Sequence, residues 1–111
     1  MEERLRAALR AAMRERDPVA TAALRSALGA LGNATAVPAP PPAATGDEHF
    51  AGSAVGVGAA EASRHVLTPA ESAAVVRAEI EERLAAASGY GPGPAADRLR
   101  AEAAVLAAYL D

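Results

Sequence analysis

Breaks rich in proline and glycine divide this chain into four stretches with helical periodicity. Asp17-Pro18 separates the first two stretches, residues 36–66 separate the two halves, and Ser88–Pro94 separates the last two. Proline lacks an amide hydrogen and glycine lacks a side chain, so such segments interrupt regular helix. The chain is therefore restricted to short helices joined by turns, and we expect an all-α protein.

The helices can bury only small side chains. Alanine occupies 33 of the 111 positions, and the aromatic residues are limited to Phe50, Tyr90 and Tyr109. Alanine is the best helix former, but it buries little apolar area per residue. We therefore expect closely approaching helices around a core of leucine, valine, isoleucine and alanine, with modest stability.

The spacing of apolar residues predicts where each helix lies and which face it buries. The predicted helices span Glu2–Arg16, Pro18–Gly32, Pro69–Ser88 and Ala95–Leu110. The predicted inward residues are Leu5, Leu9, Ala12 and Met13; Leu24, Leu28 and Leu31; Ala73, Val76, Ile80, Leu84 and Ala87; and Leu99, Ala103, Leu106 and Leu110.

These helices pair into two helical hairpins, giving four main helices in a single domain, residues 1–111. The N-terminal hairpin takes residues 1–35, a long Pro/Gly/Ala-rich flexible linker takes 36–66, and the C-terminal hairpin takes 67–111. Within the linker, proline and then glycine, alanine and serine without apolar periodicity predict that residues 38–58 are mobile.

Two pairs of residues predict local interactions in the third helix. Thr68 and Glu71 have the spacing of a capping box, in which each side chain accepts a hydrogen bond from the other's backbone N–H. Glu79 and Arg83 stand one turn apart and are expected to pair weakly at the surface.

Charge is distributed unevenly along the chain, although the net charge is only −3. Residues 1–35 carry six arginines and four acidic residues, whereas residues 36–111 carry five and ten. Arg6, Arg10 and Arg14 repeat at every fourth position, and such a stripe can follow phosphates, which makes it the candidate RNA or anion contact. A solvated face neutralised by nearby glutamates is the alternative, and the small number of charges favours it.

The residues predict no catalytic, cofactor or metal site. Cysteine is absent, and Asp47-Glu48-His49 has no second cluster to complete a metal site. Glu79, Glu81 and Glu82 have no partner nucleophile, and the serines, Ser26 among them, lack a nucleophile-elbow setting. With no transmembrane-length apolar run and no signal-peptide pattern, we expect a cytoplasmic protein.

Three short stretches share their order, spacing and residue types with one known family. They are Leu24-Arg25 with Leu28, Ala30, Leu31, Asn33 and Ala34; Leu67-Thr68-Pro69-Ala70-Glu71 with Val75-Val76, Glu79-Ile80 and Arg83; and Leu106-Ala107-Ala108-Tyr109-Leu110-Asp111. Together they resemble the GatB/YqeY family, which is similar to the tail region of the B subunit of the glutamine-dependent tRNA amidotransferase. The stretch from Gly56 to Arg64 resembles the actinobacterial branch.

The resemblance implies a helical accessory or binding module with tRNA, other RNA or an amidotransferase-type protein as partner. Family members continue into a second helical domain, so we expect a short form without it. Ammonia transfer belongs to a different domain of the amidotransferase, which implies a non-catalytic role here. Two alternatives stay open: a component of a carbon–nitrogen ligase with glutamine as amido donor, and a purely structural protein-interaction module.

Overall fold

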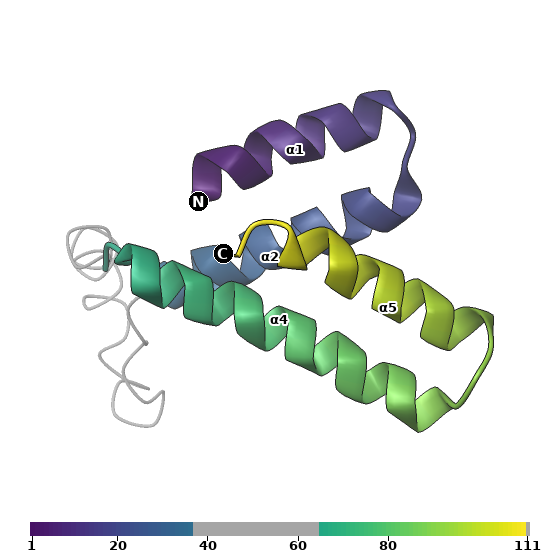
Figure 1. Ribbon diagram of the computed structural model, residues 1–111. Coiled ribbons are helices and arrows are strands. Elements are labelled where there is room, and N and C mark those ends of the chain that lie inside the picture. The colour runs from purple at the N-terminus through teal and green to yellow at the C-terminus, as the bar shows by residue number, and fades with distance from the viewer. Residues whose placement is uncertain (37–64, 111) are drawn as a thin grey trace, which may run out of the picture.

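The computed structural model describes residues 1–36 and 65–110, which form only helices and turns. The helices are α1 (Glu2–Arg14), α2 (Pro18–Thr35), α4 (Pro69–Tyr90) and α5 (Pro94–Ala107). Figure 1 shows α1 and α2 as one hairpin and α4 and α5 as a second hairpin. The expected all-α fold with two helical hairpins is confirmed. None of the helices in these two ranges is long and apolar enough to cross a membrane.

Helix α2 lies at the centre of the packing, because it contacts α1, α4 and α5. Side chains from both hairpins contribute to one core, whose buried members are Leu5, Ala12, Ala23, Leu24, Ala27, Leu31, Val76 and Leu106. Leucine, valine and alanine fill this core, as the composition predicted. Small side chains on facing helices allow their backbones to approach closely, which partly offsets the small area that each residue buries.

Helix α1 ends at Arg14, two residues before the predicted end at Arg16. Arg16 adopts a positive φ of 56°, in the left-handed region. Its N–H donates to the carbonyl of Met13 (3.2 Å), and the N–H of Asp17 donates to the carbonyl of Ala12 (2.9 Å). These two bonds form a Schellman motif, which satisfies the last carbonyls of the helix and turns the chain toward α2.

Helix α2 begins as predicted but continues beyond the predicted stop at Gly32. The Asp17 carboxylate caps its start by accepting from the N–H of Ala20 (3.0 Å), and Pro18 occupies the first helical position. At the other end the helix runs to Thr35, whose hydroxyl donates to the carbonyl of Gly32 (2.7 Å). A glycine therefore did not end this helix, because the helix ladder continues through it.

The predicted capping box at the start of α4 is confirmed. Thr68 Oγ1 accepts from the N–H of Glu71 (3.1 Å), and Glu71 Oε1 accepts from the N–H of Thr68 (2.9 Å). The helix then runs to Tyr90, two residues past the predicted end at Ser88. It ends at Gly91, whose φ of 74° is accessible to glycine at little cost.

Helix α5 begins at Pro94 and ends at Ala107, three residues before the predicted end at Leu110. The N–H groups of Tyr109 and Leu110 donate to the carbonyls of Leu106 and Ala107, at 3.0 and 3.1 Å. These bonds form a tighter turn and carry the chain back over the core.

Two side chains predicted to face inward are exposed. Met13 is 49% exposed beside the α1–α2 turn, and Leu84 is 45% exposed in the second half of α4. Met13 is the last residue but one of α1, and Leu84 lies in the C-terminal third of α4, toward the turn that ends each hairpin. The other predicted inward residues are buried or half-buried.

Several sequence-based predictions fall outside the described residues. The prediction that residues 38–58 are mobile belongs to that part of the chain, and so does the Asp47-Glu48-His49 cluster. Both stay predictions. Next to this part of the chain, the N–H of His65 donates a hydrogen bond to the carbonyl of Thr35, the last residue of α2, at 2.9 Å.

Candidate functional site

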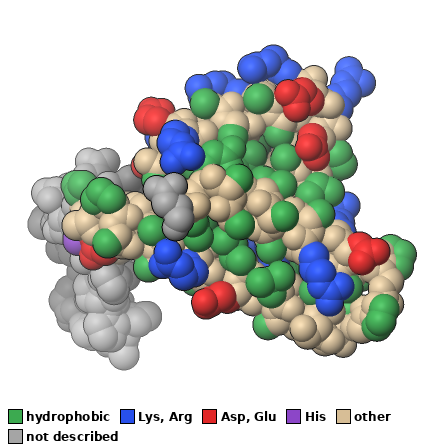
Figure 2. All heavy atoms as spheres, viewed as in Figure 1, with side chains coloured by type: hydrophobic (Ala, Val, Ile, Leu, Met, Phe, Trp, Pro, Cys, Tyr) green, Lys and Arg blue, Asp and Glu red, His purple; other side chains and the backbone are tan. Residues whose placement is uncertain are grey.

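The predicted arginine stripe lies on the solvent-facing side of α1. Arg6, Arg10 and Arg14 are all exposed, while Leu5 and Ala12 on the opposite side of the helix are buried in the core. Figure 2 shows basic side chains along the edge of the molecule formed by α1, with acidic side chains among them. The structure thus places the three guanidinium groups on one accessible face.

The three arginines differ in their ion-pair partners. Arg6 pairs with Glu2 at 2.9 Å and lies 3.9 Å from Glu3. Among the described residues, Arg10 and Arg14 form no ion pair. Exposed pairs one turn apart contribute only a few tenths of a kcal/mol, so Glu2 can release Arg6 at small cost (about 0.3–0.5 kcal/mol).

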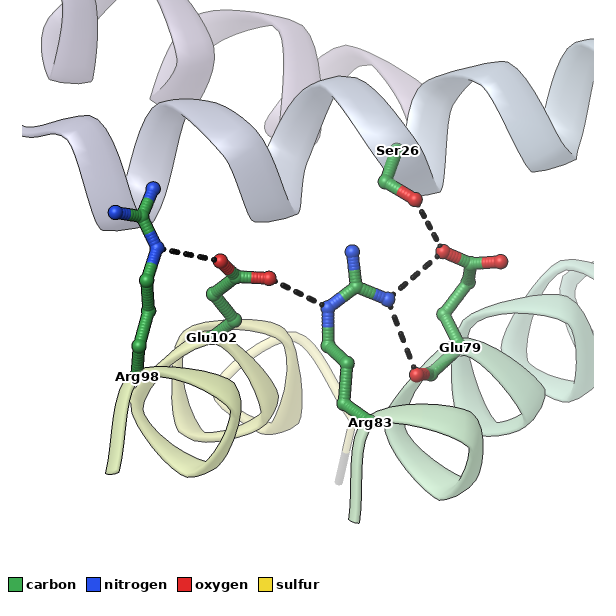
Figure 3. A network of polar contacts seen from close by, with 5 residues as sticks. All are labelled: Ser26, Glu79, Arg83, Arg98 and Glu102. Atoms are coloured by element: carbon green, nitrogen blue, oxygen red, sulfur yellow. Dashed lines mark hydrogen bonds and ion pairs between the residues drawn. The ribbon is translucent and has the colours of Figure 1, made fainter. Parts of the chain in front are cut away.

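A second polar cluster joins α2, α4 and α5 (Figure 3). Glu79 accepts hydrogen bonds from the Ser26 hydroxyl (2.6 Å) and from Arg83 Nη1 (3.0 Å). Arg83 Nε donates to Glu102 (3.0 Å), and Arg98 Nε donates to the other oxygen of Glu102 (3.2 Å). We call these five residues the interhelix network.

The interhelix network corrects the prediction that Glu79 and Arg83 pair weakly at the surface. Their side chains are only 14% and 12% exposed, and that of Glu102 is 10% exposed. The pair is nearly enclosed because α2 and α5 pack over it. In this partly dehydrated setting, a charge without its partner costs far more than it would at the surface.

The side chains of the interhelix network bind one another across three helices. Ser26 donates to a carboxylate that Arg83 also binds, and His65, the one histidine in the described ranges, contacts Glu71 instead. Arg83 donates hydrogen bonds to both neighbouring carboxylates, so its guanidinium joins Glu79 on α4 to Glu102 on α5. In the described part of the chain, no buried side-chain nitrogen or oxygen lacks a hydrogen-bond partner.

A groove of about 960 Å³ opens where the start of α1, the end of α2 and the start of α4 meet. Arg4, Arg6 and Arg77 contribute cationic groups to its lining. The Arg4 guanidinium lies over the ring of Tyr109, 5.2 Å from its centroid, which is a cation–π arrangement. We call this the terminal groove, because Met1 and Leu110 both line it.

At the edge of the terminal groove, His65 lies against the capping box of α4. Its Nε2 is 3.2 Å from Glu71 Oε1, and the histidine is exposed. The backbone N–H of Thr68, helped by His65, lowers the pKa of the Glu71 carboxyl below its usual value. Both interactions favour the charged carboxylate over the neutral acid.

The three glutamates of α4 that were considered for acid–base chemistry do not all face the same side. Glu81 and Glu82 are exposed on α4, while Glu79 turns into the interhelix network. Within residues 1–36 and 65–110, no group of three histidine, aspartate or glutamate side chains is placed to hold a metal ion.

No protein-family model, curated protein or solved structure matches this chain significantly. The resemblance to the GatB/YqeY family therefore rests on the three stretches quoted above. It stays a hypothesis, and the function that it implies is a proposal.

Sequence reasoning missed the terminal groove and most of the interhelix network. Only the Glu79–Arg83 spacing indicated part of that network. Glu102 and Arg98 also stand one turn apart, at i and i−4, and this pattern could have suggested a second pair. No sequence pattern indicates that Arg83 and Glu102 meet, because they belong to different helices.

Proposed function

We propose that this chain is a non-catalytic binding module that contacts RNA, in particular tRNA, through Arg6, Arg10 and Arg14. The observation that carries the proposal is the accessible arginine stripe on α1. The Cα atoms of successive arginines in the stripe lie about 6 Å apart along the helix axis, because four residues rise about 1.5 Å each. The resemblance to a tRNA-amidotransferase tail region supports tRNA as the first RNA to test.

The expected affinity is modest. Three cations and a net charge of −3 give little long-range attraction, so binding should resemble weak non-specific association, with a Kd of about 10⁻⁴ M or weaker at physiological salt. Lower salt should strengthen it, because each phosphate contact releases counterions.

Fluorescence anisotropy of a labelled tRNA, titrated with the protein between low and physiological salt, tests the proposal. For three contacts, the slope of log K against log salt should be about −2 to −3. Arg10→Gln and Arg14→Gln should each bring that slope closer to zero by about one. Arg100→Gln on α5, which is exposed and away from α1, is the matched control and should leave the slope unchanged.

Two results would contradict the proposal. One is a wild-type chain that does not bind tRNA even at low salt. The other is binding that survives when all three arginines of the stripe are changed to glutamine while the circular dichroism spectrum stays helical.

The alternative role in carbon–nitrogen ligation makes a different prediction. Ser26 and Glu79 are engaged with each other and with Arg83, so the chain alone should release no ammonia from glutamine. Turnover above the buffer blank that is lost on changing one polar residue would favour the enzymatic reading. Activity that appears only with added amidotransferase subunits would favour a component of that enzyme.

A further inference from the structure

The terminal groove has the size of a ligand site. Its volume of about 960 Å³ lies at the upper end of the range for small-molecule pockets, which is roughly 300–1,000 Å³. It lies among the starts of α1 and α4 and the ends of α2 and the chain, so residues distant in sequence form one surface.

Part of the groove is apolar. Leu28, Leu67 and Leu110 line it and are only half-buried, and Val66 at its edge is 83% exposed. A ligand that removes such apolar surface from water is favoured by the hydrophobic effect. The groove can therefore hold an apolar body and not only an ion.

The charged part of the groove is predominantly cationic. Arg4, Arg6 and Arg77 line it, and Glu2 is the one acidic residue among the described lining residues. Glu2 is already engaged with Arg6. Within the described ranges, neither Arg4 nor Arg77 is paired with a carboxylate. The cation–π contact with Tyr109 already restrains Arg4. Arg4 therefore loses less side-chain entropy when an anion binds.

We propose that the terminal groove binds a small amphipathic anion, with an acyl or aryl body and a single carboxylate or phosphate group. The body rests on Leu28, Leu67 and Leu110, and the anionic group lies between Arg4 and Arg77. Leucines line the part of the groove that would hold the body, and Arg4 already covers the Tyr109 ring. This favours such a ligand over an RNA strand, which would need free stacking surfaces for its bases. The site is separate from the proposed RNA contact, except that Arg6 borders both.

Decanoate, below its micelle-forming concentration, is a suitable probe for the ¹⁵N-labelled full chain. Amide shifts should move at Leu28, Leu67, Arg77 and Leu110 and saturate. Decyltrimethylammonium has a matched body with the opposite charge, and acetate has the charge without the body. Both should bind at least tenfold more weakly. Methyl decanoate lacks only the charge, and its affinity should be lower by a similar factor.

Arg77→Gln is the main variant, because Arg77 is exposed and forms no ion pair in the described part of the chain. It should weaken decanoate binding about fivefold, whereas Arg100→Gln on α5 should not change it. Arg4→Gln should have a similar effect, with unfolding curves used to confirm that losing the contact with Tyr109 leaves the fold intact.

Equal binding of decanoate and decyltrimethylammonium would overturn the proposal, since it would show apolar adsorption without anion selectivity. Shifts that map outside the groove, or an Arg77→Gln variant with unchanged affinity, would also overturn it. Tight binding of tRNA that displaces decanoate and needs Arg77 would reassign the groove to nucleic acid. Failure of the stripe proposal is distinguishable, because Arg10→Gln and Arg14→Gln should weaken tRNA binding but leave decanoate binding intact.

Discussion

Arg16 occupies a backbone conformation that suits glycine better than arginine. Its φ of 56° closes the Schellman motif after α1. A side chain with a Cβ atom costs about 1–2 kcal/mol in the left-handed region, while glycine adds entropy to the unfolded chain. We therefore expect Arg16→Gly to raise the free energy of unfolding by up to about 1 kcal/mol.

Chemical denaturation measures this effect, and Arg16→Ala is the matched control. Alanine removes the charge and the long side chain but keeps the Cβ atom, so it should not reproduce the gain. If alanine and glycine stabilised the chain equally, the backbone strain at Arg16 would not be the cause.

Thr68 should be the most sensitive polar residue at the start of α4. Its hydroxyl accepts from the N–H of Glu71, which otherwise has no partner within the helix. Thr68→Ala should lower the free energy of unfolding by about 0.5–2 kcal/mol. Thr68→Ser keeps a capping hydroxyl and should retain most of the stabilisation by the cap. An unchanged urea midpoint for Thr68→Ala would show that the cap contributes nothing in solution.

Glu71 should make the stability of the fold depend on acidic pH. The N–H of Thr68 and the imidazole of His65 lower the pKa of this carboxyl from the unfolded value of 4.5. A lowered pKa in the folded state gives stability that is complete above pH 4.5 and is lost as pH falls through the folded pKa.

Urea unfolding between pH 7 and pH 3 should therefore show a loss at the acidic end that Glu71→Gln lacks. His65→Ala should reduce the loss without abolishing it, because the bond from Thr68 is the larger cause of the lowered pKa. Identical pH profiles for the wild type and Glu71→Gln would rule out this residue as the source.

At the scale of the elements, the interhelix network links α4 to α2 and α5. Arg83 lies between Glu79 and Glu102, and all three side chains are largely enclosed. Arg83→Met would leave the enclosed Glu79 carboxylate without a cation and Glu102 with Arg98 alone, so it should lower the free energy of unfolding by about 3 kcal/mol. The free energy of unfolding of a typical domain is about 5–15 kcal/mol, so this loss would be a large fraction of the total.

A triple variant separates the cost of unpaired charges from the value of the network. Glu79→Leu and Glu102→Leu combined with Arg83→Met should recover much of the lost stability, because apolar side chains replace the ions together. Arg98→Met provides the matched control, since Arg98 is 53% exposed and should cost well under 1 kcal/mol. A larger loss for Arg98→Met than for Arg83→Met would contradict this assignment.

At the scale of the whole molecule, the two hairpins form one core although residues 37–64 separate them in sequence. The hydrogen bond from the N–H of His65 to the carbonyl of Thr35 brings both flanks of that segment together. A linker of about four glycine and serine residues can therefore replace residues 37–64 without moving α2 or α4.

We expect this shortened chain to keep its helical circular dichroism signal and to unfold in one transition. If residues 38–58 are mobile, as their composition predicts, a shorter loop should raise the free energy of unfolding by about 1–2 kcal/mol. The same linker placed within the α4–α5 turn after Gly91 lengthens a loop and serves as the opposite control. Loss of cooperative unfolding in the shortened chain would show that the replaced residues stabilise the fold.

Local patterns in the sequence were sufficient to predict the helices. Asp17-Pro18, the Thr68–Glu71 capping box and the apolar stripes act between residues only a few positions apart, so their geometry follows from the helix itself. Helix ends were predicted less well. Arg16 adopts a left-handed conformation and Gly32 lies inside a helix, both against their intrinsic preferences. The hydrogen bonds available at each helix end decide where the helix stops.

The arginine stripe could likewise be found from the sequence, because Arg6, Arg10 and Arg14 share one face of one helix. Two features depend on how separate helices pack: the enclosure of Arg83 between Glu79 and Glu102, and the presence of Arg4 and Arg77 in the lining of one groove. Sequence periodicity specifies which face of a helix is apolar, but it does not specify which helix covers that face. Only the tertiary structure decides that, because the packing of side chains from all four helices sets their angles and register.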